Sequence, residues 1–186
     1  MGEKTITISP TADTYGTSAN ASTNYGSSTT ADIWYGPQFE ENVGSTTFIK
    51  FADADIPKGK IVSAYLYLSV TAINVGSGAG NCYIRNLSAS WAEDTLTWNN
   101  RPSVYSTVYG RIDLGSTGAN KKSDDLKDLI TAWQSTNYGL RVNAGSIDAS
   151  TIRTRENSTS TERPKLEITY IPVPSGGFSG FSPWIF

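Results

Sequence analysis

The sequence predicts an all-β sandwich that folds as one domain. Ser, Thr and Gly are its most abundant residues, and charged residues make up only 17% of the chain, a composition typical of β-proteins on outer surfaces. Apolar and polar residues alternate over residues 61–72, as expected for a half-buried strand. The apolar positions of this strand, which we expect to face the core, are Val62, Ala64, Leu66, Leu68 and Val70. A chain of 186 residues is long enough to bury a core of its own.

Further strands are predicted from shorter runs of β-branched and aromatic residues. They cover residues 5–9, 31–35, 46–51, 81–87, 106–114, 140–143, 150–154 and 165–171. A Gly-rich run at 76–80 predicts a hairpin turn that pairs strands 61–72 and 81–87. Segments 11–30 and 115–122 lack this alternation and are predicted to be loops.

One helix is predicted, over residues 123–134. Ser123 is a favourable N-cap, and acidic residues follow it in the first turn, where the helix dipole stabilises them. Apolar side chains then recur at helical spacing, at Leu126, Leu129, Ile130 and Trp133. We expect this face to close one end of the sandwich.

Charge and residue content exclude several functions. Basic and acidic residues number 15 and 17, and the net charge is −2, so no basic patch predicts a nucleic-acid partner. Histidine is absent, which removes the commonest general base and metal ligand, and we predict no catalytic and no metal-binding residue. A glycosidase built on two carboxylates stays open, because pairs formed in space are invisible in sequence. Cys82, the single cysteine, is predicted to be a small buried apolar residue.

No segment of the sequence is apolar over a length that could span a membrane. The chain leads from Met1 directly into the first predicted strand, without the apolar stretch of a signal peptide. Two interpretations follow: a secreted protein has lost its leader, or the chain is made and assembled in the cytoplasm.

Residues 90–102 form the most informative segment, Ser-Trp-Ala-Glu-Asp-Thr-Leu-Thr-Trp-Asn-Asn-Arg-Pro. Its Asn-Asn pair and Pro predict a long ordered connection rather than a strand or helix. We predict that this connection is a structural latch, tied down by Trp98, Asn99, Asn100 and Arg101. In that role Trp98 is buried and Arg101 bonds to backbone carbonyls. The alternative is a ligand-binding loop with an exposed tryptophan platform.

Several sequence motifs, in their order along the chain, agree with one family. They lie at residues 12–15, 24–28, 50–51, 61–68, 97–102, 125–133, 138–140 and 163–170. In this combination, residues 8–171 resemble the disaggregatase-related (DNRLRE) domain. The resemblance implies a jelly-roll β-sandwich akin to carbohydrate-binding modules, and a broad role in surface binding or adhesion. We accordingly divide the chain into a sandwich domain, 1–171, and a tail, 172–186.

A sugar-binding face is predicted on the open side of the paired strands 61–72 and 81–87. Its candidate residues are Tyr65, Tyr67, Tyr83 and Arg85, with Trp91 as an outlying platform. Aromatic rings flanked by hydrogen-bonding groups suit the apolar faces and hydroxyls of a sugar. The alternative is that these tyrosines form ordinary cross-strand pairs or are covered by a loop.

No cofactor is predicted. A structural calcium ion stays open by analogy with other jelly rolls, because Asp13, Asn20 and Asn24 offer oxygen atoms in the 11–30 loop without matching a calcium-loop spacing. A mixed-charge run includes Arg153, Arg155, Glu156, Glu162 and Arg163. We expect solvated ion pairs there.

The tail joins a Pro-Val-Pro spacer to a Gly-Ser-rich segment with five large apolar residues, Phe178, Phe181, Trp184, Ile185 and Phe186. These residues cannot form a core of their own, so we predict that they bind a neighbouring protein subunit. The alternative is that the tail folds back onto its own domain.

Two functions follow. The favoured one is a non-enzymatic structural or adhesive subunit of a larger surface assembly, such as a phage virion or surface filament, anchored by the tail. The alternative is a stand-alone secreted carbohydrate-binding module, and a virion protein could also bind glycans. Both place the protein on a virion, on a cell surface or outside the cell.

Overall fold

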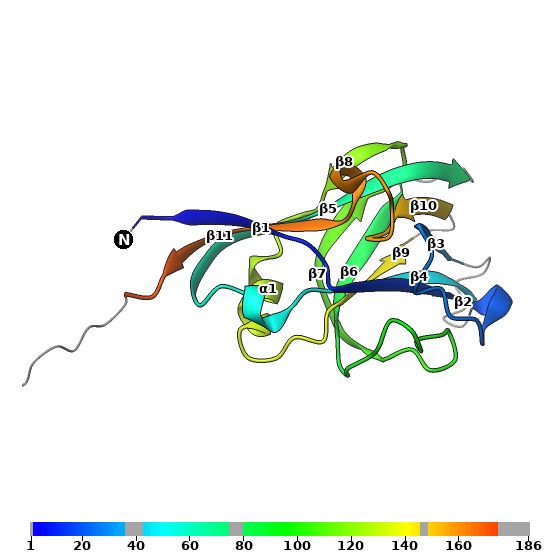
Figure 1. Ribbon diagram of the computed structural model, residues 1–186, viewed down its shortest axis with the longest axis horizontal. Helices are drawn as coiled ribbons and strands as arrows, with labels where there is room; N and C mark the ends of the chain where they lie inside the picture. Colours follow the sequence, from blue (N-terminus) through cyan, green and yellow to red (C-terminus); the bar gives the residue numbers. More distant parts are fainter. Residues whose placement is uncertain (1, 36–42, 75–79, 146–148, 175–186) are drawn as a thin grey trace, which may run out of the picture.

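The computed structural model describes residues 2–35, 43–74, 80–145 and 149–174 (Figure 1). The strands are β1 (Lys4–Ile8), β2 (Ala12–Thr17), β3 (Thr30–Tyr35), β4 (Gly44–Lys50), β5 (Gly59–Asn74), β6 (Asn81–Leu87), β7 (Val104–Asp113), β8 (Gly118–Lys122), β9 (Leu140–Ala144), β10 (Ala149–Arg153) and β11 (Lys165–Pro172). The helices are α1 (Lys127–Trp133) and the short 3₁₀ turns η1 (Ser18–Asn20), η2 (Asp53–Asp55) and η3 (Ser160–Glu162). The tail residues from Phe178 to Phe186 lie outside the described residues.

The strands form one antiparallel sheet that curls over on itself, in the order β1-β11-β5-β10-β3-β4-β9-β6-β7. Strand β8 pairs with β5, and β2 pairs with β4. We call the part from β1 to β3 the first leaf and the part from β4 to β7, with β2, the second leaf. Strand β3 connects them, because it pairs with β10 on one side and β4 on the other. The predicted all-β jelly-roll sandwich with one short helix is confirmed.

The core lies between the two leaves. From the first leaf, Leu66 and Leu68 of β5 are fully buried, and from the second leaf Ile84 of β6 is fully buried as well. The apolar face predicted for the helix joins this core, since Leu126, Leu129, Ile130 and Trp133 are at most 2% exposed. Cys82 is buried, as predicted.

Strand β5 differs from its predicted apolar pattern at its N-terminal end. Val62 is half-buried, whereas Ile61 is only 7% exposed. The pairing register with β11 shifts between Ser63 and Ile61, which are opposite Thr169 and Tyr170. This bulge re-aims the side chains on its N-terminal side, so the expectation that Val62 faces the core is wrong.

The helix begins later than predicted. It starts at Lys127, because Ser123 bonds to the sheet and does not cap the helix. Its Oγ accepts a hydrogen bond from the Leu66 amide of β5 at 3.0 Å. Asp125 Oδ1 instead accepts from the Lys127 amide at 3.0 Å. Within the described ranges, no helix has the length and apolar character needed to cross a membrane.

Two strands occupy segments predicted to be loops. Strand β2 pairs with β4 over its whole length, yet its buried side chains include the polar Asp13, Thr14 and Thr17. Polar residues inside the fold remove the apolar alternation by which a strand is identified. Strand β8 is short, mostly exposed and paired to β5, so it also lacks an apolar face.

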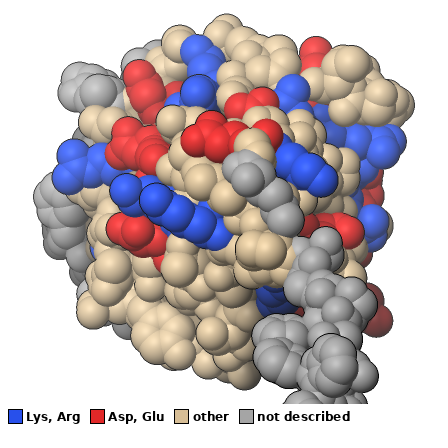
Figure 2. All heavy atoms as spheres, turned by 90° about the vertical axis from the view of Figure 1, so that its left-hand side faces the viewer, with Lys and Arg blue, Asp and Glu red and all other residues tan. Residues whose placement is uncertain are grey.

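Basic and acidic side chains are interspersed on the visible face of the end where β1 and β11 lie (Figure 2). This distribution agrees with the nearly balanced charge of the sequence.

Candidate functional site

A groove of about 800 Å³ lies on the outer face of the second leaf. Its floor is formed by side chains of three adjacent strands, which register places on one face: Arg85 is opposite Arg141, and Tyr83 is opposite Asn143. Thr46 of β4 continues the row, because it is opposite Asn143 as well. The alternate residues of these strands face the core, so the groove follows from the two-residue period of a strand.

The rim of the groove comes from two other parts of the fold. Trp34 and Tyr35 line it at the end of β3, and Trp98 and Arg101 line it from the 88–103 connection. The groove therefore combines aromatic rings with polar and cationic groups.

The described lining residues of the groove carry positive charge: three are arginines, at Arg85, Arg101 and Arg141, and none has a carboxylate. Arg85 Nη1 donates to Asn143 Oδ1 at 2.8 Å, and its guanidinium carbon lies 5.3 Å from the centre of the Tyr83 ring. These contacts hold the Arg85 fork in a defined orientation.

Trp98 and Arg101 form the rim contact of the predicted latch. Trp98 is 9% exposed. The Arg101 guanidinium carbon lies 3.8 Å from the centre of the Trp98 ring, and Nη1 donates to the Trp98 carbonyl. Burial lowers the pKa of Arg101 from its usual value. The burial of Trp98 and the bond from Arg101 to a backbone carbonyl agree with what was predicted for a latch, and its effect on stability stays a prediction.

The two asparagines of the predicted latch have different partners. The Asn99 amide donates to the Ala21 carbonyl at 3.1 Å, and its side chain donates to Ser22 Oγ at 3.0 Å. Asn100 acts within its own turn: Oδ1 accepts from the Thr97 amide at 2.6 Å. Asn99 thus ties the connection to the 18–30 segment, and Asn100 shapes the connection itself.

Trp91 is not in the groove. Its Nε1 donates to the Tyr138 carbonyl at 2.9 Å, and its ring packs beside Phe48 at a centroid distance of 6.2 Å. Phe48, Leu87 and Leu96 form a small buried cluster against which Trp91 lies. The Trp91 ring thus packs against this cluster, apart from the candidate sugar-binding residues on β6.

Tyr65 and Tyr67 do not share a face with Tyr83 and Arg85. Strand β5 pairs with β8, β10 and β11 in the first leaf, whereas β6 pairs with β7 and β9 in the second leaf. The predicted hairpin pairing of these strands is therefore wrong; residues 75–79 lie outside the described residues. The chain crosses from one leaf to the other between β5 and β6, so the expected four-residue surface does not form.

The two tyrosines of β5 form contacts with cations on neighbouring strands. Lys122 Nζ lies 3.5 Å from the Tyr65 ring centre, and Lys165 Nζ lies 5.3 Å from that of Tyr67. Tyr67 also donates to Glu167 at 3.3 Å. These are the cross-strand pairs that the sequence left as an alternative.

The sequence interpretation missed Trp34, Tyr35, Arg141 and Asn143 as groove residues. A signal for two of them exists, because Arg141 and Asn143 alternate with three buried residues of β9. This alternation does not indicate which strand lies beside β9. The neighbouring strand determines whether the Arg141 and Asn143 side chains line a groove.

The sequence profile of carbohydrate-binding module family 96 matches residues 4–170. No curated protein matches the chain.

Proposed function

The chain belongs to carbohydrate-binding module family 96, and on that premise we propose that its groove binds an acidic polysaccharide. The family is one of binding modules, so the proposed role is to hold a glycan and not to cleave it. We place that role on a cell surface or outside the cell, where polysaccharides are found.

The observation that carries this proposal is the set of three arginines in a groove without a carboxylate among its described lining residues. A guanidinium fork matches the geometry of a carboxylate or sulfate group and can bind it through two parallel hydrogen bonds. The rings of Tyr83, Trp34 and Tyr35 supply apolar surface for the faces of sugar rings. Together these groups suit a chain of sugars that carry negative charge.

The experiment is a calorimetric titration of the protein with a polyuronate and with a neutral glucan of similar length. We expect tight binding of the polyuronate only, weakened by salt because the contacts are ionic. Arg85→Ala should lower the affinity about 10-fold or more, since a hydrogen bond to a charged group contributes about 1.5–3 kcal/mol. Arg153→Ala is the matched control, because Arg153 forms an ion pair with Glu162 and does not line the groove. Equal binding of both glycans, or no effect of Arg85→Ala, would contradict the proposal.

The tyrosines of the first leaf remain a second candidate face. Removing one stacking ring should weaken binding by about 1 kcal/mol if that ring contacts the sugar. Parallel titrations of Tyr83→Ala and Tyr67→Ala therefore distinguish the groove from the face around Tyr65 and Tyr67. We expect a loss for Tyr83→Ala alone.

The structural or adhesive role in a virion or filament stays a prediction, because it rests on tail residues outside the described part of the chain. Deleting residues 178–186 tests it. If the tail anchors the domain, the shortened chain folds with nearly unchanged stability and no longer enters its assembly. Unfolding of the shortened chain would instead assign the tail to the domain itself.

A further inference from the structure

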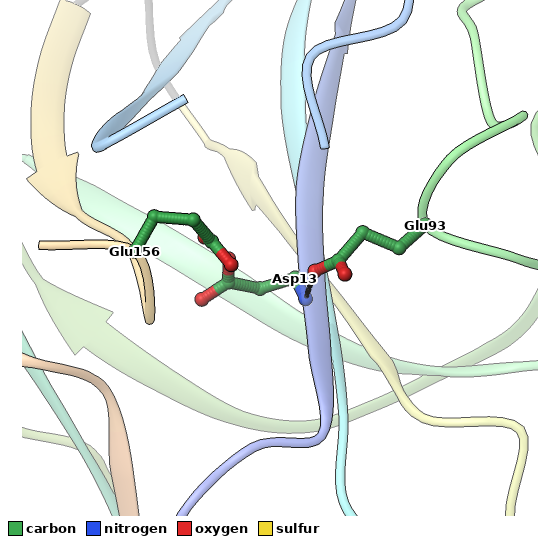
Figure 3. Close-up of side chains that lie close together, drawn as sticks. All are labelled: Asp13, Glu93 and Glu156. Carbon is green, nitrogen blue, oxygen red and sulfur yellow. Dashed lines mark hydrogen bonds between the residues drawn. The ribbon is translucent and has the colours of Figure 1, made fainter. Parts of the chain in front are cut away.

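Three carboxylates from distant parts of the chain meet outside the groove. Asp13 lies on β2, Glu93 on the 88–103 connection and Glu156 just after β10. One oxygen from each lies within 4.8 Å of the other two. Figure 3 shows the Asp13 carboxylate directed at that of Glu156, with Glu93 on the other side of β2.

Part of this cluster is satisfied by Arg155. Its Nε and Nη2 donate to the two oxygens of Glu93 at 2.8 and 2.6 Å. Its backbone amide donates to Asp13 Oδ2 at 2.8 Å. The Asp13 amide in turn donates to Glu93 Oε1 at 2.7 Å. These contacts fix the positions of Asp13 and Glu93, and Arg155 Nε also forms an ion pair with Glu156 Oε1 at 2.9 Å.

Two oxygens of the cluster have no hydrogen-bond partner. Asp13 Oδ1 and Glu156 Oε2 are both buried and unpartnered, and Asp13 as a whole is only 1% exposed. A buried acceptor without a donor is costly, and native proteins rarely leave one without a water, proton or ion. Two such acceptors that face each other indicate a positively charged occupant.

The local charge agrees with this. Three carboxylates and one guanidinium leave a net charge of −2 when all are ionised. Arg155 therefore does not neutralise the cluster when its three carboxylates are ionised.

We propose that Asp13 and Glu156 bind a calcium ion, with Asp13 Oδ1 and Glu156 Oε2 as its direct ligands and Glu93 adding negative charge nearby. The donor set consists of oxygen only, which suits a hard divalent cation, and calcium completes its 6–8 ligands readily with water. The side chains of Glu93 and Glu156 are 19% and 20% exposed, so water has access to the cluster. The ion ties β2 to the segment that follows β10. It is therefore a structural ion and is independent of glycan binding.

The test uses the full chain, treated with a chelator and dialysed into metal-free buffer at constant pH and ionic strength. Calorimetric titration with CaCl₂ should give one ion per chain. Thermal unfolding should shift upward by about 5–10 °C when calcium is present at 100 times its dissociation constant. MgCl₂ at the same concentration should give a smaller shift, because magnesium requires a stricter octahedral arrangement.

Three variants locate the ion. Asp13→Asn and Glu156→Gln each keep the shape of the side chain and supply an amide donor to the facing oxygen, so both should fold and lose the calcium shift. Glu162→Gln is the matched control, because it removes a carboxylate from a surface ion pair with Arg153. We expect it to keep the full shift.

Each other outcome overturns the proposal. Without calcium binding and without a thermal shift in the unmodified protein, the two oxygens share a proton instead. An equal shift in all three variants places the ion elsewhere. If the two cluster variants do not fold, anomalous scattering from crystals of the calcium-soaked protein decides, since a peak between Asp13 and Glu156 is required.

Discussion

Replacing Trp98 by Ala measures how strongly the latch connection is held to the sandwich. The ring is 9% exposed and lies under the Arg101 guanidinium at 3.8 Å. Truncating a buried tryptophan to alanine costs about 3–5 kcal/mol in unfolding free energy. Trp98 lies at the rim of the groove, so water can enter the space that the ring leaves. We therefore expect the lower end, about 3 kcal/mol.

This loss is large enough to measure in two ways. For a domain of this size it lowers the unfolding temperature by about 6–12 °C, and urea denaturation followed by circular dichroism gives the free energy itself. Trp98→Phe keeps an aromatic ring and should cost about half as much. A loss below about 1 kcal/mol for Trp98→Ala would refute the argument, because such a value is typical of an exposed residue.

Other predictions concern two contacts of the latch connection and one contact between β6 and α1, all measured by urea denaturation. Asn24 donates through one nitrogen to the Glu93 and Leu96 carbonyls, both at 2.7 Å, so Asn24→Ala should cost about 2 kcal/mol. Gly26→Ala should destabilise the domain by about 1–3 kcal/mol, because the added Cβ would lie 2.4 Å from the Glu93 carbonyl oxygen. Asn86→Ala leaves Trp133 Nε1 without its buried acceptor at 2.9 Å and should cost about 1–3 kcal/mol. Stability equal to the unmodified protein in any of these variants contradicts the corresponding contact.

The parts of the fold that follow from the spacing of apolar residues within one strand or helix could be predicted from the sequence. The core side of β5 from Ala64 to Val70 and the apolar face of α1 are buried as expected. The apolar alternation did not predict strand β2, because its buried residues include the polar Asp13 and Thr14. The partners of these residues come from other segments of the chain. Propensity and pattern describe one strand at a time, and they do not identify its neighbours.

The candidate site depends on those neighbours. Tyr83 and Arg85 were identified on β6, but the groove forms because β9 places Arg141 and Asn143 beside them. The expected partners Tyr65 and Tyr67 lie on the other leaf, since the chain crosses over where the sequence suggested a simple hairpin. The carboxylate cluster is harder still to predict. Arg155 and Glu156 were expected to form solvated pairs, and only the fold places them beside Asp13 and Glu93.

The pairing of β1 with β11 has a mechanical consequence. Lys4, where β1 begins, is opposite Tyr170 near the end of β11. The start of β1 and the end of β11 therefore lie at the same end of the sheet (Figure 1). Tension applied through the chain on both sides of the domain acts first on the hydrogen bonds at that edge. The ladder then separates one bond pair at a time toward Ile8, whereas strands pulled from opposite ends resist with all their bonds at once. The groove strands β4, β6 and β9 are not part of this ladder. The groove therefore keeps its shape while β1 separates from β11 under load.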